Sequence, residues 1–175
     1  MPVTPFHWGP VLLIGLLFFQ FLDIPSLLIS SVAPDVDGLY IVIFRPFMPH
    51  HGLTHTYVVA SVIGIIVAGA MYSLKGVTGK IMEKIGLYKT SSFRKILYSP
   101  LLGAYSHIFL DSFLYPEMNP LYPLLGNPFV GAAPEHIRYI AVYGLCGLSF
   151  LIGLIVYFKK RTSMLAQPHL NPSEK

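Results

Sequence analysis

Three long apolar runs constrain this chain more than any other feature of its sequence. They cover residues 54–74, 96–115 and 139–158, and a helix needs about 20 apolar residues to cross a bilayer. Only 11% of the residues are charged and 54% are hydrophobic, whereas a soluble domain carries about 25% charged residues. The sequence therefore predicts an all-α fold, an integral membrane helical bundle with three full spans.

The first apolar region, residues 8–34, allows two interpretations. Asp23 and Pro25 interrupt it, and a proline disfavours helix at the residue before it. The region is therefore either a kinked fourth span or an N-terminal helical hairpin of two short helices. We expect the hairpin, because only a hairpin returns the chain to the side on which it started, where His7 can join a site with later residues.

The charges of the connecting segments predict the orientation of the chain. Residues 75–95 hold six basic residues and one acid, and the segment after the last run begins with Lys159 and two further basic residues. Residues 116–136 hold two Glu and no Lys or Arg. Because basic segments stay on the cytoplasmic side, we expect 75–95 and the C-terminus in the cytoplasm, and 35–55 and 116–136 outside. Segment 75–95 also has apolar residues at helical spacing, typical of a helix lying on the membrane surface.

The same features predict the domain organisation and exclude several functions. We expect one membrane-embedded domain over residues 1–161 and a disordered cytoplasmic tail over 162–175. The net charge of +4 comes mostly from residues beside apolar runs, which indicates membrane topology, so we expect no nucleic-acid partner. The single cysteine, Cys146, excludes a disulfide framework and a cysteine-based zinc site. No nucleotide-binding G-x-x-x-x-G-K motif occurs.

The sequence HIFLD places two ionisable residues inside the second apolar run. His107 and Asp111 are four residues apart, which puts both side chains on one face of a helix. An imidazole and a carboxylate on one face commonly hold a divalent metal. The alternative is a His–Asp hydrogen bond that joins two helices, because polar residues within membranes often act in this way.

Two further groups of ionisable residues lie next to apolar segments. His51 and His55 have the same spacing of four, with His50 adjacent, and Asp35 and Asp37 follow a proline at the end of an apolar helix. The alternatives are a solvated surface loop for the histidines and an ordinary turn for the aspartates. The predicted topology puts these groups on the same side as the HIFLD pair, and one or two divalent cations would offset the repulsion between buried carboxylates.

Four segments in this order resemble the YdjM-type family of membrane-bound metal-dependent hydrolases. They read FHWGPVLLIG, APDVDG, HHGLTHT and YSHIFLDSFLYPEMNPLYPL, between about residues 6 and 125. The family is distantly similar to zinc-dependent phospholipase C and to the single-strand-specific zinc nucleases. The chain departs from the family at His51, where the family has an arginine, and an imidazole cannot make the bidentate phosphate contact of an arginine.

The resemblance implies a metal site and an activity. Its implied metal ligands are His7, Asp35, Asp37, His50, His55, His107 and Asp111. We expect one to three divalent ions, zinc before magnesium because imidazoles are present. A metal-bound water has a lowered pKa, and Asp37 or Asp23 would serve as general base.

The expected function is therefore a membrane-bound divalent-metal-dependent hydrolase. Its substrate would be a lipid or lipid-linked phosphoester that reaches the site from the surrounding membrane lipid. The protein would lie in the cell membrane, plasma or inner, with the site facing outward. Two alternatives stay open: a non-catalytic membrane protein with a structural metal, and a metal-ion binder or transporter. Transport is disfavoured because residues 139–158 contain no ionisable Asp, Glu, His, Lys or Arg.

Overall fold

The computed structural model describes residues 4–36, 53–87 and 91–166, and all the regular elements in these ranges are helices, with no strand among them. This confirms the all-α prediction. Asp37 and His50 lie outside the described residues. In chain order the elements are η1 (Thr4–His7), α1 (Trp8–Leu17), α2 (Ile24–Ser30), η2 (Ala33–Asp35), η3 (Leu53–His55), α4 (Tyr57–Ser73), α5 (Lys75–Lys84), α6 (Phe93–Ser112) and α7 (Glu135–Leu165).

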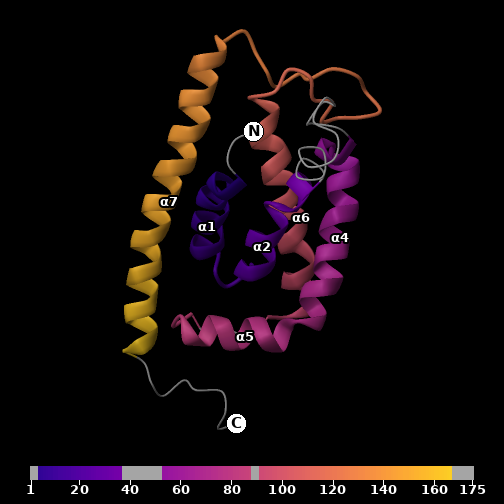
Figure 1. Cartoon of the computed structure of the whole chain (residues 1–175). Coiled ribbons are helices and arrows are strands. Elements are labelled where there is room, and N and C mark those ends of the chain that lie inside the picture. The colour runs from indigo at the N-terminus through magenta and orange to yellow at the C-terminus, as the bar shows by residue number, and fades with distance from the viewer. Residues whose placement is uncertain (1–3, 37–52, 88–90, 167–175) are drawn as a thin grey trace.

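The helices α1 and α2 form a hairpin that lies between α7 and α6 (Figure 1). Asp23 caps the start of α2, where its side chain accepts a hydrogen bond from the backbone N–H of Ser26. Pro25 sits in the first turn of α2, where its missing N–H removes no helical hydrogen bond. Leu16 and Ile24 meet in one buried cluster across the turn. Of the two arrangements open for residues 8–34, the structure has the hairpin.

Glycines allow the hairpin to approach its neighbours closely. A Cβ atom on Gly9 of α1 would lie 2.1 Å from the carbonyl oxygen of Cys146 on α7. One on Gly103 of α6 would lie 2.5 Å from the carbonyl oxygen of Leu27 on α2. Small residues at helix crossings are typical of membrane proteins, in which close packing holds helices together. These two contacts fix the hairpin between α6 and α7.

Helix α5 turns away from α4 and lies across one end of the bundle (Figure 1). The two helices meet at an angle of 76°. Met82 of α5 is buried in the core, whereas Val77 and Ile81 are exposed. Part of the predicted surface helix at 75–95 is therefore observed, over Lys75–Lys84.

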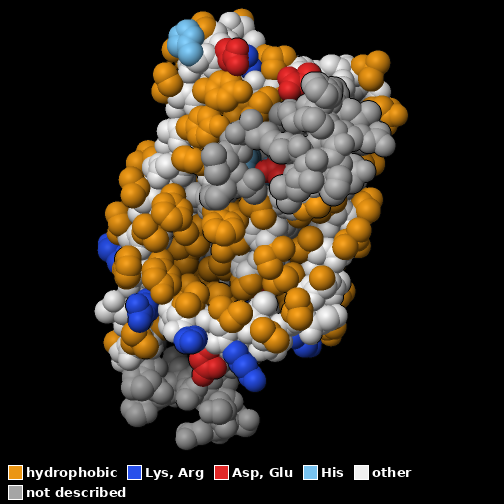
Figure 2. Space-filling view, viewed as in Figure 1, with side chains coloured by type: hydrophobic (Ala, Val, Ile, Leu, Met, Phe, Trp, Pro, Cys, Tyr) orange, Lys and Arg blue, Asp and Glu red, His pale blue; other side chains and the backbone are white. Residues whose placement is uncertain are grey.

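Of the three full spans that the sequence predicts, one is clearly observed among the described residues. By length and hydropathy, α7 can cross a membrane, whereas α4 passes the same test only together with the bent α5. Alone, α4 has 17 residues, fewer than the ~20 of a comfortable span. Helix α6 does not pass, and polar groups such as Arg94 and His107 lower its hydropathy. Hydrophobic side chains nevertheless cover the middle of the face seen in Figure 2.

The far end of α7 runs into the segment that the sequence assigns to the tail. The tail was expected to begin at residue 162, but α7 continues to Leu165. The last helical turn therefore includes residues predicted to be disordered. Residues 167–175 lie outside the described part of the chain.

Candidate metal centre

The predicted His107–Asp111 pair faces the interior of the bundle from α6. Both residues are fully buried, and the Nε2 atom of His107 lies 3.2 Å from the Oδ2 atom of Asp111. The spacing of four residues on one helix brings the side chains together, as the sequence predicts. This pair supplies one nitrogen and one carboxylate to the site.

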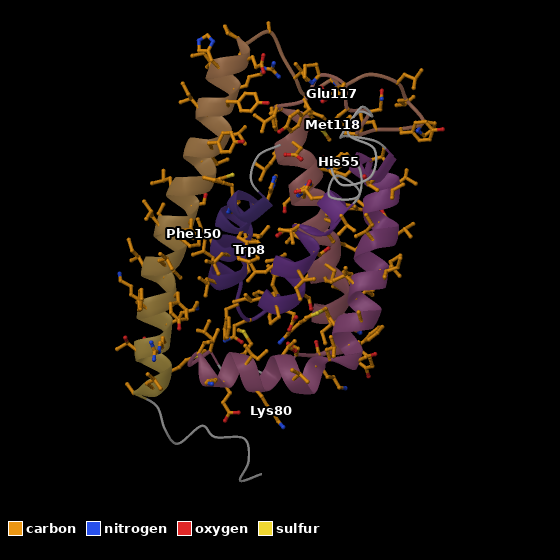
Figure 3. All side chains as sticks on the ribbon, viewed as in Figure 1. Trp8, His55, Lys80, Glu117, Met118 and Phe150 are labelled. Atoms are coloured by element: carbon orange, nitrogen blue, oxygen red, sulfur yellow. The ribbon has the colours of Figure 1, made fainter. Side chains whose placement is uncertain are left out.

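Asp35 and His55 reach the same point from two other elements. The Oδ1 atom of Asp35, at the end of η2, lies 3.3 Å from His107 Nε2 and 3.4 Å from His55 Nε2. His55, at the end of η3, also has its Nε2 atom 3.8 Å from Asp111 Oδ2. Each of these four residues offers one ligand atom, and all four atoms lie within 4.8 Å of one another. They form a cluster that could hold a metal ion; Figure 3 labels His55 at this end of the bundle.

His7 adds a fifth donor from the N-terminal side. It is buried at the junction of η1 and α1, and its Nε2 atom lies 3.3 Å from the Oδ1 atom of Asp111. Its ring stacks on that of His107 with centroids 4.2 Å apart. The two oxygens of Asp111 therefore face different imidazoles, with His7 on one side and His55 and His107 on the other.

The other ring nitrogens of two histidines are held by neighbouring groups. The Nδ1 atom of His107 lies 2.8 Å from the backbone carbonyl oxygen of Ser31, so it must carry the proton and donate it. This leaves the Nε2 lone pair free to bind a cation, the arrangement usual for metal-bound histidines. The Nδ1 atom of His55 lies 3.1 Å from the hydroxyl of Thr54. These partners orient the rings toward the cluster.

The spacing of the donors fits a metal ion better than direct hydrogen bonds. Four N···O distances lie between 3.2 and 3.4 Å, longer than the ~2.7–2.9 Å of charge-assisted hydrogen bonds. Ligands about 2.0–2.1 Å from a tetrahedral zinc ion would be roughly 3.3 Å apart. Within the described residues, His7 Nε2, His107 Nε2 and both carboxylate oxygens of Asp111 are buried without a hydrogen bond. Buried polar atoms in this state call for a further partner, and a divalent cation suits this donor set.

The electrostatic environment favours ionised carboxylates at this point. Burial raises the pKa of Asp35, but the neighbouring imidazoles of His107 and His55 outweigh burial, so this pKa lies well below its ordinary value. Asp35 is also the most accessible member of the cluster, with 10% of its side chain exposed against 0–1% for the other three.

The end of α6 next to the cluster is held by side chains distant in the sequence. The Nη1 atom of Arg138, on α7, donates hydrogen bonds to the carbonyls of Phe113 and Leu114, at 2.8 and 3.2 Å. Asn127 donates to the carbonyls of Ser112 and Tyr115. Carbonyls at a helix C-terminus have no partner in the helix, and a cation beside them is favourable. These contacts fix the turn that follows Asp111.

The structure does not bring Asp23 to the cluster. Its carboxylate accepts hydrogen bonds from Ser26 and Ser91 at the start of α2, whereas Asp35 follows the end of that helix. These bonds satisfy the buried carboxylate, which caps α2 and is not available to the cluster. No sequence pattern indicates the carbonyl of Ser31 as the partner of His107, because a backbone contact between two helices depends on their packing.

The fold and the cluster define an all-helical protein with a long apolar helix and a buried Asp/His site. The chain belongs to the YdjM inner membrane protein family, whose model matches residues 6–167. This match confirms the resemblance drawn from the sequence and supports an inner-membrane location. Comparisons with curated proteins and with solved structures gave no significant match.

Proposed function

We propose that this protein is a membrane-bound, divalent-metal-dependent hydrolase acting on a lipid or lipid-linked phosphoester. One observation carries the proposal. Imidazole nitrogens and carboxylate oxygens from four separate elements converge in a buried site, in a bundle whose surface exposes many large hydrophobic side chains. Burying this many ionisable groups is costly unless a cation or a reaction uses them.

His7, Asp35, His55, His107 and Asp111 are the residues that would hold the metal. A divalent ion there would supply a water of lowered pKa and polarise a phosphoryl oxygen. His107, whose Nδ1–H donates a hydrogen bond to the carbonyl oxygen of Ser31, keeps its Nε2 atom available as a ligand. Asp37, two residues beyond Asp35 in the sequence, is the proposed general base, and His50 is a further proposed ligand; both are outside the described residues.

The surroundings of the cluster support a lipid substrate. The connection between α6 and α7 passes over the end of α6 that carries Asp111 (Figure 1). This connection exposes Leu121, Tyr122, Leu124 and Leu125, whose side chains are apolar or amphipathic. An exposed apolar patch of this kind marks an interaction with lipid or another apolar partner. A lipid headgroup could reach the cluster while its acyl chains stay beside this connection.

A structural metal site is the second candidate function. Four of the five donor side chains are at most 3% exposed, and a coordinatively closed site of this type would stabilise the bundle without catalysis. A catalytic site instead keeps one coordination position open to water. The two functions would use the same metal ligands, and only the catalytic one would turn over a substrate.

Metal content and phosphoester turnover of matched variants test the proposal. Asp111→Asn keeps the shape of the side chain but loses its charge. Losing a group that only hydrogen-bonds to a metal ligand typically lowers metal affinity 10–100-fold, so we expect the loss of Asp111 to lower it at least as much. His136 is exposed at the start of α7 and belongs to no cluster, so His136→Ala should keep metal and activity. Wild type that binds zinc but hydrolyses no phosphoester in mixed lipid micelles would favour the structural alternative. Asp111→Asn that retains a full complement of metal would overturn the site itself.

A further inference from the structure

The end of the molecule opposite the metal centre carries most of its positive charge. Helix α5 lies across this end, and the last turns of α7 reach it (Figure 1). Lys80 points away from the bundle here, far from His55 at the other end (Figure 3). Lys and Arg side chains gather at this end in the space-filling view (Figure 2). We call this surface the basic end, formed by Lys75, Lys80, Lys84, Lys159, Lys160 and Arg161.

Tertiary contacts join the two halves of the basic end. The hydroxyl of Tyr157 on α7 donates a 2.8 Å hydrogen bond to the carbonyl of Ile85, directly after α5. A Cβ atom on Gly86 would lie 2.9 Å from the side chain of Arg161, so the two residues are in close contact. Residues about 75 positions apart in the sequence therefore present their charges on one surface.

Within the part of the chain that the structure describes, no carboxylate pairs with the charges of the basic end. Among the described residues, none of its six basic side chains forms an ion pair, although Lys75 and Lys160 lie over the rings of Tyr72 and Phe19. Glu83 is the one exposed carboxylate of α5. An unpaired cluster of like charges is unfavourable by itself and attracts an anionic partner.

Apolar side chains accompany these charges and indicate what the partner is. Val77 and Ile81 of α5 are 56% and 54% exposed, and Phe158 of α7 is 57% exposed. A helix that lies at a steep angle to its neighbour, with exposed apolar residues beside lysines, matches helices that insert shallowly at a lipid headgroup layer. The 76° bend after α4 gives α5 this direction.

From these features we propose that the basic end binds anionic phospholipid headgroups, in the leaflet opposite the metal centre. Val77 and Ile81 enter the boundary of the acyl chains while Lys80, Lys84 and Lys159 contact headgroup phosphates. The exposed, flexible ammonium groups suit a set of mobile headgroups. This lipid contact is separate from any lipid hydrolysed at the metal centre, and it does not depend on the proposed function.

Thermal melting in mixed micelles tests the proposal with the full-length protein. We expect phosphatidylglycerol to raise the melting temperature and phosphatidylcholine to have little effect. Raising the salt concentration should remove the difference between the two lipids, because the screening length shortens from about 10 Å at 0.1 M to about 3 Å at 1 M ionic strength. The salt series uses wild-type protein, so it stands whether or not a variant folds.

A charge variant and a matched control locate the surface. Replacing Lys80, Lys84 and Lys159 together by Gln should weaken the apparent affinity for phosphatidylglycerol roughly 100-fold, since each basic residue near an anionic surface contributes about 1 kcal/mol. Replacing the same three by Arg should preserve it. Equal stabilisation by both lipids, or an unchanged preference in the Gln variant, would overturn the proposal. If inorganic phosphate stabilised the protein as much as phosphatidylglycerol, the basic end would bind free phosphate and the lipid proposal would be overturned.

Discussion

The Nδ1 atom of His107 on α6 lies 2.8 Å from the backbone carbonyl oxygen of Ser31, directly after α2. This contact joins the two helices and fixes which nitrogen of the imidazole faces the cluster. Its geometry depends on how closely α2 and α6 approach, and Gly103 sets that distance. The metal centre is therefore coupled to helix packing one turn away.

Gly103→Ala should weaken metal binding although Gly103 contacts no metal ligand side chain. The new Cβ atom would lie 2.5 Å from the carbonyl oxygen of Leu27 and 3.1 Å from the nitrogen of Ser31, both backbone atoms. We expect a loss of about 1–3 kcal/mol in stability from overpacking and a 10–100-fold loss in metal affinity from displacing the Ser31 carbonyl. Isothermal titration with zinc and thermal melting would measure both.

Gly69→Ala is the matched control for this substitution. Gly69 lies in α4, and a Cβ atom there would have no neighbour within 4 Å. Alanine should leave metal affinity unchanged and stabilise the helix by about 0.5–1 kcal/mol. If both variants bound zinc as tightly as wild type, the Ser31 contact would have no part in metal binding.

Removing the metal should lower the stability of the whole bundle. The donors come from η1 and η2, which flank the hairpin, from η3 and from α6, so a bound ion would link four separate segments of the chain. An ion present at 100 times its dissociation constant stabilises the folded state by about 2.7 kcal/mol. The melting temperature should therefore fall on adding a chelator and recover on adding zinc. An equal melting temperature with and without chelator would argue against metal binding.

Replacing Arg138 should destabilise the end of α6. Arg138→Met keeps the length of the side chain but loses the hydrogen bonds to the carbonyls of Phe113 and Leu114. Hydrogen bonds from charged groups contribute about 1.5–3 kcal/mol, so we expect a loss of that size in thermal or denaturant unfolding. Arg94→Met, at an exposed position near the start of α6, should change stability by less than about 0.5 kcal/mol. Similar losses in the two variants would contradict a capping role.

Topology reporters fused to the protein test the proposed orientation of the chain in the membrane. A reporter fused after Lys175 should report the cytoplasm, because the basic end of α7 precedes it. One inserted near Gly126 should report the outside, because residues 116–136 contain no Lys or Arg. The opposite pair of results would place the metal centre on the cytoplasmic side. Green fluorescent protein fusions provide the cytoplasmic readout, and alkaline phosphatase fusions provide the readout for the outside.

The sequence by itself determined the features that depend on local spacing. Four residues separate His107 from Asp111, and a helix of any packing puts them on one face. The interruption at Asp23 and Pro25 left a kinked span and a hairpin open for residues 8–34, and the hairpin was expected because it brings His7 to the side of the later ionisable residues. The concentration of basic residues in two segments follows from the sequence in the same way.

Only the tertiary structure decided which ionisable groups meet. Asp35 and His55 are 20 residues apart and reach His107 through the packing of α2 and α4 against α6. The same spatial arrangement separates Asp23 from the cluster, since a carboxylate can cap a helix or join a buried site, and the sequence alone does not choose. The lengths of the spans also depended on structure. The chain bends by 76° at the end of α4, a direction that hydropathy does not encode.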